Sequence, residues 1–165
     1  MTTLRDLAFA DFDMEVAATR RVLARLPDAE FGWKPHEKSS ALGELGMHIV
    51  NTFSWQVIVL TTDGIDFAAS PPPRIEAASS QALVAAFDAN VPEVRAALDA
   101  ADEAALGRDF TLRMGERVIF TRPRAVTFRT FGLSHIAHHR AQLTVYLRLL
   151  GLPVPPVYGP TADER

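Results

Sequence analysis

The sequence predicts an all-α protein that folds as a four-helix bundle. Four long segments carry apolar side chains at spacings of three and four residues, which is the period of an amphipathic helix. Strand-like alternation is confined to one short stretch in front of the last segment. Hydrophobic residues make up 48% of the chain and charged residues 22%, values that are typical of a globular protein. Four such helices with little strand pack most simply as a bundle.

The first helix is expected over residues 3–26. Its inward stripe consists of Phe12, Val16, Thr19, Leu23 and Leu26. Pro27 ends the helix because proline cannot continue the backbone hydrogen bonding. In the connection 27–40, the large apolar residues Phe31 and Trp33 are expected to pack onto the bundle.

The second helix is expected over residues 40–61. It is apolar on nearly every side, which predicts that it is the most buried of the four. Ser39 and Ser40 are candidates for its N-cap. Gly43 and Gly46 are poor helix formers, so we expect a neighbouring helix or loop to approach the backbone closely there.

Residues 62–78 contain TDG and then SPPPR, which indicates a surface linker with polyproline character. The linker is long enough to permit a crossover connection or to form a lid. Ser79 and Ser80 are expected to cap the third helix, over residues 80–101. Pro92 lies inside the apolar stripe of this helix and should kink it or break it in two.

Short alternating runs around a turn predict a small hairpin within residues 107–120. The last helix is expected over residues 122–150, with Thr121 or Arg122 as its cap. Pro123 then falls in the first turn, where proline is tolerated.

Gly151 is a natural residue to end the last helix, because glycine adopts the left-handed conformation without strain. The tail that follows is rich in proline and apolar at its start, so we expect it to fold back onto the bundle. The sequence shows no internal repeat. Its length of 165 residues is that of one domain, and we expect residues 1–165 to form a single domain.

The last helix holds three of the five histidines. His135 and His139 are four residues apart, so they project from azimuths about 40° apart on a helix. The same side of the helix carries Phe128, Phe131, Gly132, Leu143, Tyr146 and Leu150. The pair therefore faces the core, where an imidazole without partners is costly. Hydrogen bonds to neighbours would satisfy it, and so would a metal ion.

His48 is the third candidate ligand, because it lies on the buried side of the second helix. Its azimuth is shared by Leu45, Thr52, Trp55 and Val59. Glu44 lies one turn before it and Asn51 one turn after, and either side chain could hold its second ring nitrogen. Three neutral imidazoles would leave positions on a cation open to water or substrate. The donor set does not decide between Zn, Ni, Mn and Fe.

The remaining polar residues near these histidines carry weaker predictions. His36 lies in a polar run and is expected to be exposed. His138 and Arg140 are expected to be exposed as well, with binding of an anionic substrate as the alternative. Gln142 is a candidate partner for a metal-binding histidine, and Tyr146 is a candidate wall of the pocket.

Charge and composition exclude several functional classes. The net charge of −3 and the pI of about 5.9 provide no basic surface for nucleic acid or for an anionic membrane. The chain has no cysteine, so a disulfide framework and a cysteine nucleophile are excluded, and any thiol must come from a small molecule. No apolar run reaches the roughly 18 residues of a membrane span. Since the N-terminus lacks the pattern of a secretory signal, a cytoplasmic location is expected.

Three segments together resemble the DinB/YfiT-like metalloenzyme family: FGWKPHEKSSALGELGMHIVNTFSW, LSHIAHHRAQLTVYLRLLG and VPPVYGPTADE. The resemblance covers essentially the whole chain, and H-x-x-H-H-R-x-Q-L is its most specific part. It implies a four-helix bundle, often dimeric, in which three histidines hold a divalent metal. On this chain those residues are His48, His135 and His139. Ala141 departs from the glycine that many relatives carry, and we expect only tighter packing there.

The resemblance also implies a class of chemistry. Some relatives are metal-dependent thiol S-transferases or mycothiol-dependent isomerases, in which the metal activates the thiol of a small cofactor. We therefore expect an enzyme of transferase or hydrolase type that activates a water or a small-molecule thiol. It would act on an unidentified small substrate, and the family implies a homodimer. The alternative is a non-catalytic, metal-binding stress-response protein.

Overall fold

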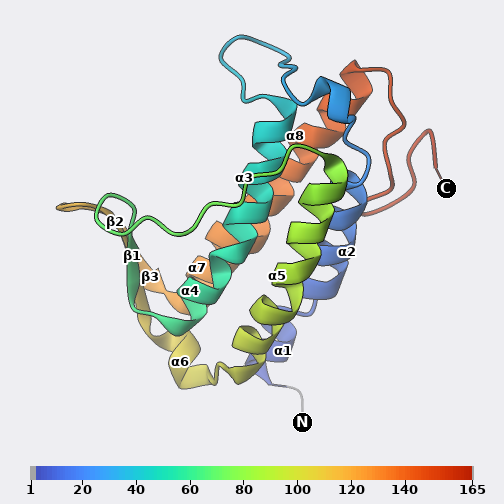
Figure 1. Cartoon of the computed structure of the whole chain (residues 1–165). Coiled ribbons are helices and arrows are strands. Elements are labelled where there is room, and N and C mark those ends of the chain that lie inside the picture. The colour runs from blue at the N-terminus through green and yellow to red at the C-terminus, as the bar shows by residue number, and fades with distance from the viewer. Residues whose placement is uncertain (1–2, 165) are drawn as a thin grey trace.

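The computed structural model describes residues 3–164, and most of this part of the chain is helical. Its long helical segments are α2 (Phe12–Leu23), α3 (Leu42–Ser54) continued by α4 (Gln56–Thr61), α5 (Ser80–Ala100) and α8 (His135–Leu149). Both α2 and α3 pack against α5 and against α8, so these four helices enclose a common core (Figure 1).

The core is built from large apolar side chains that each of the four helices contributes. Phe12, Phe53, Phe87 and Leu143 are almost completely buried, and they come from α2, α3, α5 and α8 respectively. The rings of Phe53 and Phe87 are 4.7 Å apart between centroids, and those of Phe12 and Phe53 are 6.1 Å apart. The apolar stripes that the sequence shows therefore meet at the centre of the bundle.

The protein is mostly helical, as predicted, but the all-α class is not fully confirmed because the fold includes a small sheet. Its three strands, in the order β1-β2-β3, are β1 (Gly64–Asp66), β2 (Asp109–Met114) and β3 (Arg117–Pro123). The antiparallel pair of β2 and β3 is the predicted hairpin, with Gly115 at φ +61° in its turn. The parallel pairing of β1 with β2 was not predicted.

Asp66, the last residue of β1, organises the turn that follows the strand. One Asp66 carboxylate oxygen accepts hydrogen bonds from the backbone N–H groups of Ala68, Ala69 and Gly115, at 2.9–3.1 Å. The contact to Gly115 joins this turn to the tip of the hairpin. Short-range sequence patterns do not reveal such a bond because its partners lie far apart in the chain.

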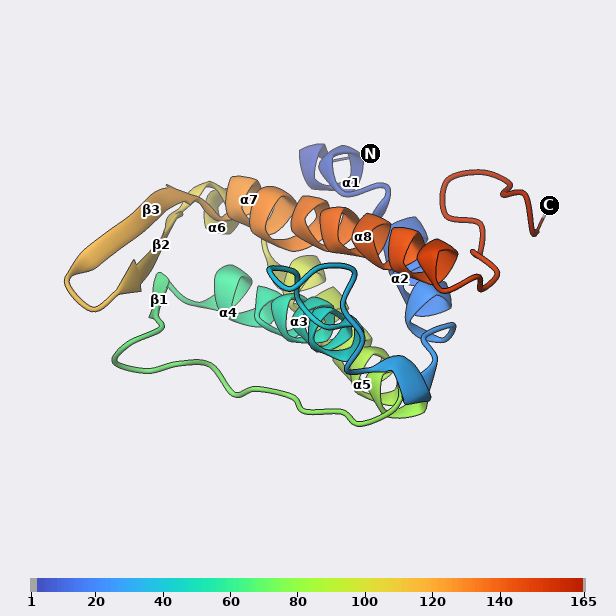
Figure 2. The ribbon, with the colours of Figure 1, turned by 90° about the horizontal axis from the view of Figure 1, so that it is seen from above.

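The linker 62–78 is a crossover connection. After β1 it returns along the length of the molecule, so that α3–α4 and α5 run in the same direction (Figures 1 and 2). Ser79 then caps α5 as expected, because its hydroxyl accepts the backbone N–H of Ala82 at 3.1 Å. The helix α5 continues through Pro92, so of the two predicted effects of this proline the break into two helices is wrong. A short helix that the sequence did not predict, α6 (Glu103–Gly107), follows.

The first predicted helix is two helices, α1 (Leu4–Ala8) and α2, separated at residues 9–11. The interruption lets Phe9 turn into the core, where its ring packs edge-on against Phe128 with centroids 5.0 Å apart. Tertiary packing of one aromatic ring thus overrides helix propensity at this point.

The second predicted helix begins later than expected and is divided at Trp55 into α3 and α4. Its N-cap is Ala41, and neither Ser39 nor Ser40 has this role. The Glu44 carboxylate accepts the backbone N–H of Ala41 at 2.8 Å, which satisfies a donor at the helix start.

The glycines of α3 allow close packing, as predicted. A Cβ atom on Gly43 would lie 2.6 Å from the ring of Phe31, which belongs to the preceding loop. A Cβ atom on Gly46 would lie 2.8 Å from the Leu83 side chain of α5. A loop and a helix therefore both approach α3 in the turns that precede His48.

The last predicted helix differs from expectation in its first half. The strand β3 extends to Pro123, and α7 (Arg124–Thr127) is followed by a π-helix, η2 (Phe128–Ser134), before α8 begins. A Cβ atom on Gly132 in η2 would lie 2.6 Å from the side-chain oxygen of Gln56, so α4 and η2 are in close contact. Gly151 ends α8 with φ at +71°, as predicted.

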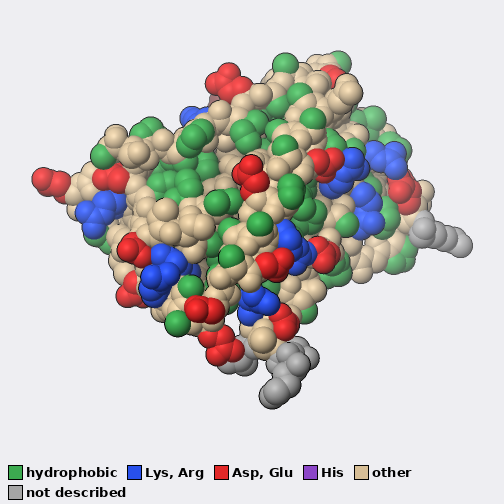
Figure 3. All heavy atoms as spheres, turned by 60° about the horizontal axis from the view of Figure 1, so that its bottom comes forward, with side chains coloured by type: hydrophobic (Ala, Val, Ile, Leu, Met, Phe, Trp, Pro, Cys, Tyr) green, Lys and Arg blue, Asp and Glu red, His purple; other side chains and the backbone are tan. Residues whose placement is uncertain are grey.

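Acidic and basic side chains are mixed on one face of the molecule. On the face drawn in Figure 3, lysine and arginine side chains lie among aspartate and glutamate side chains. None of the helices within residues 3–164 combines the length and the apolar character that a membrane span requires.

Candidate metal centre

Three histidines converge between α3 and α8. Each of His48, His135 and His139 offers one ring nitrogen, and these three atoms lie within 4.8 Å of one another. The two Nε2 atoms of His48 and His135 are 3.3 Å apart. The ring centroid of His139 lies 4.6 Å from that of His48 and 4.5 Å from that of His135. The structure thus brings together the three residues that the sequence singled out.

The spacing of one pair of these nitrogens fits a small divalent cation. Bonds of about 2.0–2.1 Å at tetrahedral angles separate two nitrogen donors by about 3.3–3.4 Å. The distance between the Nε2 atoms of His48 and His135 has this value. No carboxylate belongs to the group among the described residues, so the donor set consists of three imidazoles. Such a set leaves at least one coordination position to another ligand.

A buried arginine on α8 fixes the face that this helix turns toward α3. Arg140 is 1% exposed, and its guanidinium donates to the backbone oxygen of Glu15 at 3.1 Å and to the Thr19 hydroxyl at 3.0 Å. One guanidinium nitrogen lies 2.8 Å from the Glu15 carboxylate and donates to the Tyr158 hydroxyl at 2.5 Å. Because these contacts hold one side of α8 against α2 and the tail, the opposite side carries His135 toward α3.

The histidines are held in the uncharged form that binds metals. Burial lowers the pKa of His48 to about 4. Repulsion from His139 and His135 in their protonated forms, and from Arg74, lowers this pKa as well. Burial is also the main cause that lowers the pKa values of His135 and His139. A hydrogen bond with Gln142 partly offsets this effect on the pKa of His139. At neutral pH the rings therefore keep the lone pairs that a cation needs.

Gln142 contacts one of the three rings, as predicted, and orients it. The side-chain oxygen of Gln142 lies 2.7 Å from Nδ1 of His139. An amide oxygen only accepts, so Nδ1 of His139 carries the proton and Nε2 carries the lone pair. Such a contact fixes both the tautomer and the direction of a metal-binding histidine.

Glu44 and Asn51 do not hold the second nitrogen of His48, contrary to prediction. Glu44 caps the start of α3 instead. The Asn51 amide donates to the backbone oxygen of Ile75 at 3.0 Å, and its oxygen accepts the Ile75 N–H at 2.7 Å. Asn51 therefore binds the linker against α3, a role that depends on a contact 24 residues away in the sequence.

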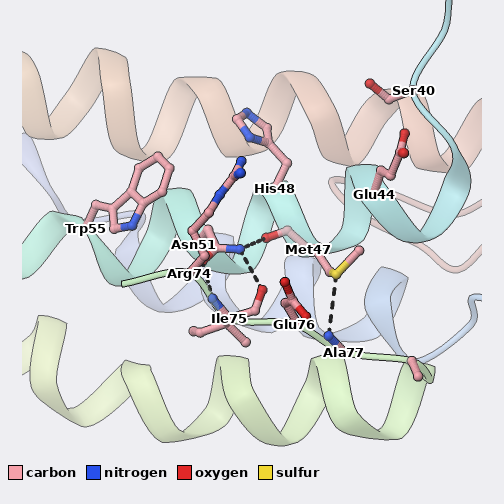
Figure 4. Close-up of a pocket in the computed structure, with 11 residues that line it drawn as sticks. Ser40, Glu44, Met47, His48, Asn51, Trp55, Arg74, Ile75, Glu76 and Ala77 are labelled. Carbon is pink, nitrogen blue, oxygen red and sulfur yellow. Dashed lines mark hydrogen bonds between the residues drawn. The ribbon is translucent and has the colours of Figure 1, made fainter. Parts of the chain in front are cut away.

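A cavity of about 710 Å³ adjoins the histidine cluster (Figure 4). Its lining residues come from α3, from the loop before it and from the linker: Ser40, Glu44, Met47, His48, Asn51, Trp55, Arg74, Ile75, Glu76, Ala77 and Ala78. His48 belongs both to this wall and to the cluster, so the cavity and the candidate metal site share a side chain. The volume is that of a pocket for a small molecule.

The other residues considered from the sequence have different roles. His36 and His138 are exposed, as expected, and neither belongs to the cluster. Arg140 is buried on the side of α8 that faces α2. The prediction that it is exposed and the alternative that it binds substrate are therefore both wrong. Tyr146 does not line the cavity, but its hydroxyl donates to the backbone oxygen of Ser40, which does.

Sequence reasoning missed Arg74 and Met47 as lining residues. Met47 is next to His48 in α3, and helical periodicity places it off the histidine azimuth. Arg74 follows three prolines in the linker, and the only available signal was that this linker could form a lid. Neither signal shows which side of α3 the linker covers.

Comparisons with known proteins agree with this fold. The model of the DinB superfamily matches residues 11–143. The uncharacterized protein YrdA of Bacillus subtilis (strain 168) is 27% identical over 155 residues, which cover 93% of this chain and 87% of that protein.

Two crystal structures of DinB-like proteins are similar to this chain. The one from Bacillus cereus ATCC 10987 has a TM-score of 0.69 and 21% identity, and the match covers 92% of this chain and 95% of that one. The other, YjoA from Bacillus subtilis, has a TM-score of 0.71 and 21% identity, covering 92% and 96%. At this identity the likeness concerns the fold alone.

Proposed function

The chain belongs to the DinB superfamily, and we propose that it is a metal-dependent enzyme whose divalent ion is held by His48, His135 and His139. The observation that carries the proposal is the convergence of three uncharged imidazoles from two helices, with two Nε2 atoms 3.3 Å apart. A purely structural site would close the coordination sphere with a fourth protein ligand. The group found in the described residues has three members.

The reaction class follows from the donor set and from the composition of the chain. A divalent ion held by neutral imidazoles supplies a Lewis acid, which lowers the pKa of a coordinated water or thiol. The protein has no cysteine, so a thiol nucleophile would have to come from a small-molecule co-substrate. The activity is then that of a thiol S-transferase or of a hydrolase, with Zn, Ni, Mn or Fe as the ion.

The residues around the three ligands orient the site and shape its cavity. Gln142 fixes the ring of His139, and Asn51 holds the linker that forms the outer wall of the cavity. Trp55 and Met47 add apolar surface to the wall. The cavity thus binds a small substrate beside His48, and its apolar wall reduces the access of water to the reacting group.

We also propose that residues 1–165 form one domain. The superfamily model ends at residue 143, but the tail beyond α8 packs back onto the bundle. The Tyr158 hydroxyl donates to the Glu15 carboxylate at 2.8 Å, and Asp163 pairs with Arg148. These contacts support the tail as part of the same folding unit.

Metal analysis and turnover test the enzyme proposal together. The purified protein should contain about one divalent ion per chain, and the His135→Ala variant should lose it. The matched control is His138→Ala, which removes an exposed histidine of the same helix and should leave the metal content unchanged. Turnover is measured with a panel of thiol and electrophile pairs and of hydrolysable esters, before and after chelation.

Activity that chelation abolishes and the ion restores is the expected result. A protein that binds one ion but turns over none of the panel would be the non-catalytic metal-binding protein instead. Activity that survives removal of the ion would contradict the enzyme proposal.

A further inference from the structure

We propose that Arg74 makes the cavity beside His48 selective for small organic anions, an inference that rests on the metal-dependent function proposed above. The predicted ligand carries a carboxylate or a similar group that pairs with Arg74. Its metal-binding group reaches the histidine cluster, and its apolar part lies against Met47 and Trp55.

The backbone on both sides of Arg74 is fixed, so its position is not that of a free surface loop. Ile75 exchanges two hydrogen bonds with the Asn51 side chain, at 2.7 and 3.0 Å. The Trp55 indole N–H donates to the backbone oxygen of Pro73 at 3.4 Å. Both neighbours of Arg74 in the sequence are therefore attached to the helical segment that carries His48.

The Arg74 side chain extends from the linker across the cavity toward His48 (Figure 4). Within residues 3–164, no carboxylate oxygen lies within 4.0 Å of a basic nitrogen of Arg74, since Arg74 takes part in none of the ion pairs found there. Its guanidinium is thus free to bind a ligand carboxylate in a bidentate manner.

A divalent ion on the histidine cluster would change the sign of the charge in the cavity. Glu44, Glu76 and Arg74 are the charged lining residues, so with neutral histidines the wall carries one net negative charge. A divalent ion on the cluster turns this into one net positive charge. The Glu44 carboxylate is also engaged by the backbone N–H of Ala41, at the end of the cavity away from Arg74 (Figure 4). The most favourable place for an anionic group is therefore between the ion and Arg74.

The cavity also limits the size of this anion. A volume of about 710 Å³ suits a small molecule and is too small for a folded partner or a nucleic acid. Met47, Trp55 and Ile75 give the wall an apolar part, which favours an organic body over an inorganic ion.

The test uses the full chain loaded with Co²⁺, whose absorption spectrum reports a thiolate that enters the coordination sphere. The probes are 3-mercaptopropionate and its uncharged analogue 3-mercaptopropionamide, which present the same thiol but differ in charge. The wild type should bind the anionic probe about tenfold more tightly, as expected for a charge-assisted pair with a guanidinium. Arg74→Gln should remove this difference by weakening only the anionic probe, and Arg74→Lys should retain part of it.

Arg21→Gln is the matched control, because Arg21 is an exposed arginine of α2 that does not line the cavity. This control should preserve the tenfold preference. Equal affinity for the two probes in the wild type would overturn the role of Arg74 while leaving the metal site in place. Equal weakening of both probes by Arg74→Gln would overturn it too, because the arginine would then act on the structure of the linker. If Co²⁺ binds and neither thiol changes its spectrum, the open coordination position is absent, and the proposed function falls with the inference.

Discussion

The substitution Arg140→Met should strongly destabilise the protein, because it leaves a buried carboxylate without its cation. The Arg140 side chain is 1% exposed and the Glu15 side chain is 8% exposed, with 2.8 Å between the charged atoms. Removal of one partner from a buried ion pair costs about 3–5 kcal/mol of unfolding free energy. After the substitution the Tyr158 hydroxyl still donates to Glu15 at 2.8 Å, so we expect the lower half of this range.

Urea denaturation of the metal-free protein, followed by circular dichroism, measures this loss. The matched control is Arg148→Met on the same helix, where the ion pair with Asp163 is partly exposed at 52% and 25%. An exposed pair of this kind should cost less than about 1 kcal/mol. The double variant Arg140→Met/Glu15→Gln should be more stable than Arg140→Met alone, because the unpaired charge is gone.

The same variant tests whether Arg140 positions the metal site. Since its contacts hold α8 against α2, Arg140→Met should weaken Zn²⁺ binding in a competition with a chromophoric chelator, and Arg148→Met should not. A loss of stability below about 1 kcal/mol would refute the assignment of a buried, paired Arg140. Unchanged Zn²⁺ affinity in the folded variant would refute its role in orienting the histidines.

Further predictions concern acid stability, packing and assembly. The hydrogen bond from Arg129 lowers the pKa of Asp11 below its ordinary value of 3.8, so the unfolded state binds more protons in acid. This stabilisation is fully present above pH 3.8 and is lost as the pH falls through the lowered pKa of Asp11. The Asp11→Asn variant should therefore lose less stability in this pH range, in an acid titration followed by fluorescence. An acid profile identical to that of the wild type would contradict the assignment. The Gly46→Ala variant should lose about 1–3 kcal/mol of unfolding free energy, measured by urea denaturation, because the new Cβ atom would lie 2.8 Å from the Leu83 side chain. An unchanged denaturation midpoint would contradict this, because it would show that Leu83 moves away without cost. From the family resemblance we expect a homodimer, and size-exclusion chromatography with light scattering would contradict this by giving the mass of one 18.1 kDa chain.

Helical periodicity was sufficient to place each of the three histidines on a buried face, and the family resemblance grouped them as one ligand set. The four-residue spacing of His135 and His139 defines one face of α8, and the apolar neighbours of His48 define the buried face of α3. These local patterns give the face of each helix, whereas the level at which the three side chains meet is set by the packing of α3 against α8.

The features that the sequence did not reveal depend on contacts between distant residues. Arg140 looks like a surface residue by composition, and its burial is made favourable by Glu15 and Thr19, more than 120 residues away, and by the folded-back Tyr158. Asn51 binds the linker at Ile75, a pairing that no periodicity encodes.

The helix interruptions have the same origin in tertiary structure. The π-helix in front of α8 packs against α4, where the absence of a side chain on Gly132 leaves room for Gln56. The hydrophobic pattern is compatible with an uninterrupted α-helix at this place, so the pattern alone gave the wrong element.

Anomalous X-ray diffraction at the zinc edge, from crystals of the Zn²⁺-loaded protein, tests the central claim most directly. We predict one strong peak about 2.0–2.1 Å from a ring nitrogen of each of His48, His135 and His139, with a fourth position facing the cavity that Arg74 lines. A peak at another site, or coordination that excludes His48, would contradict the claim.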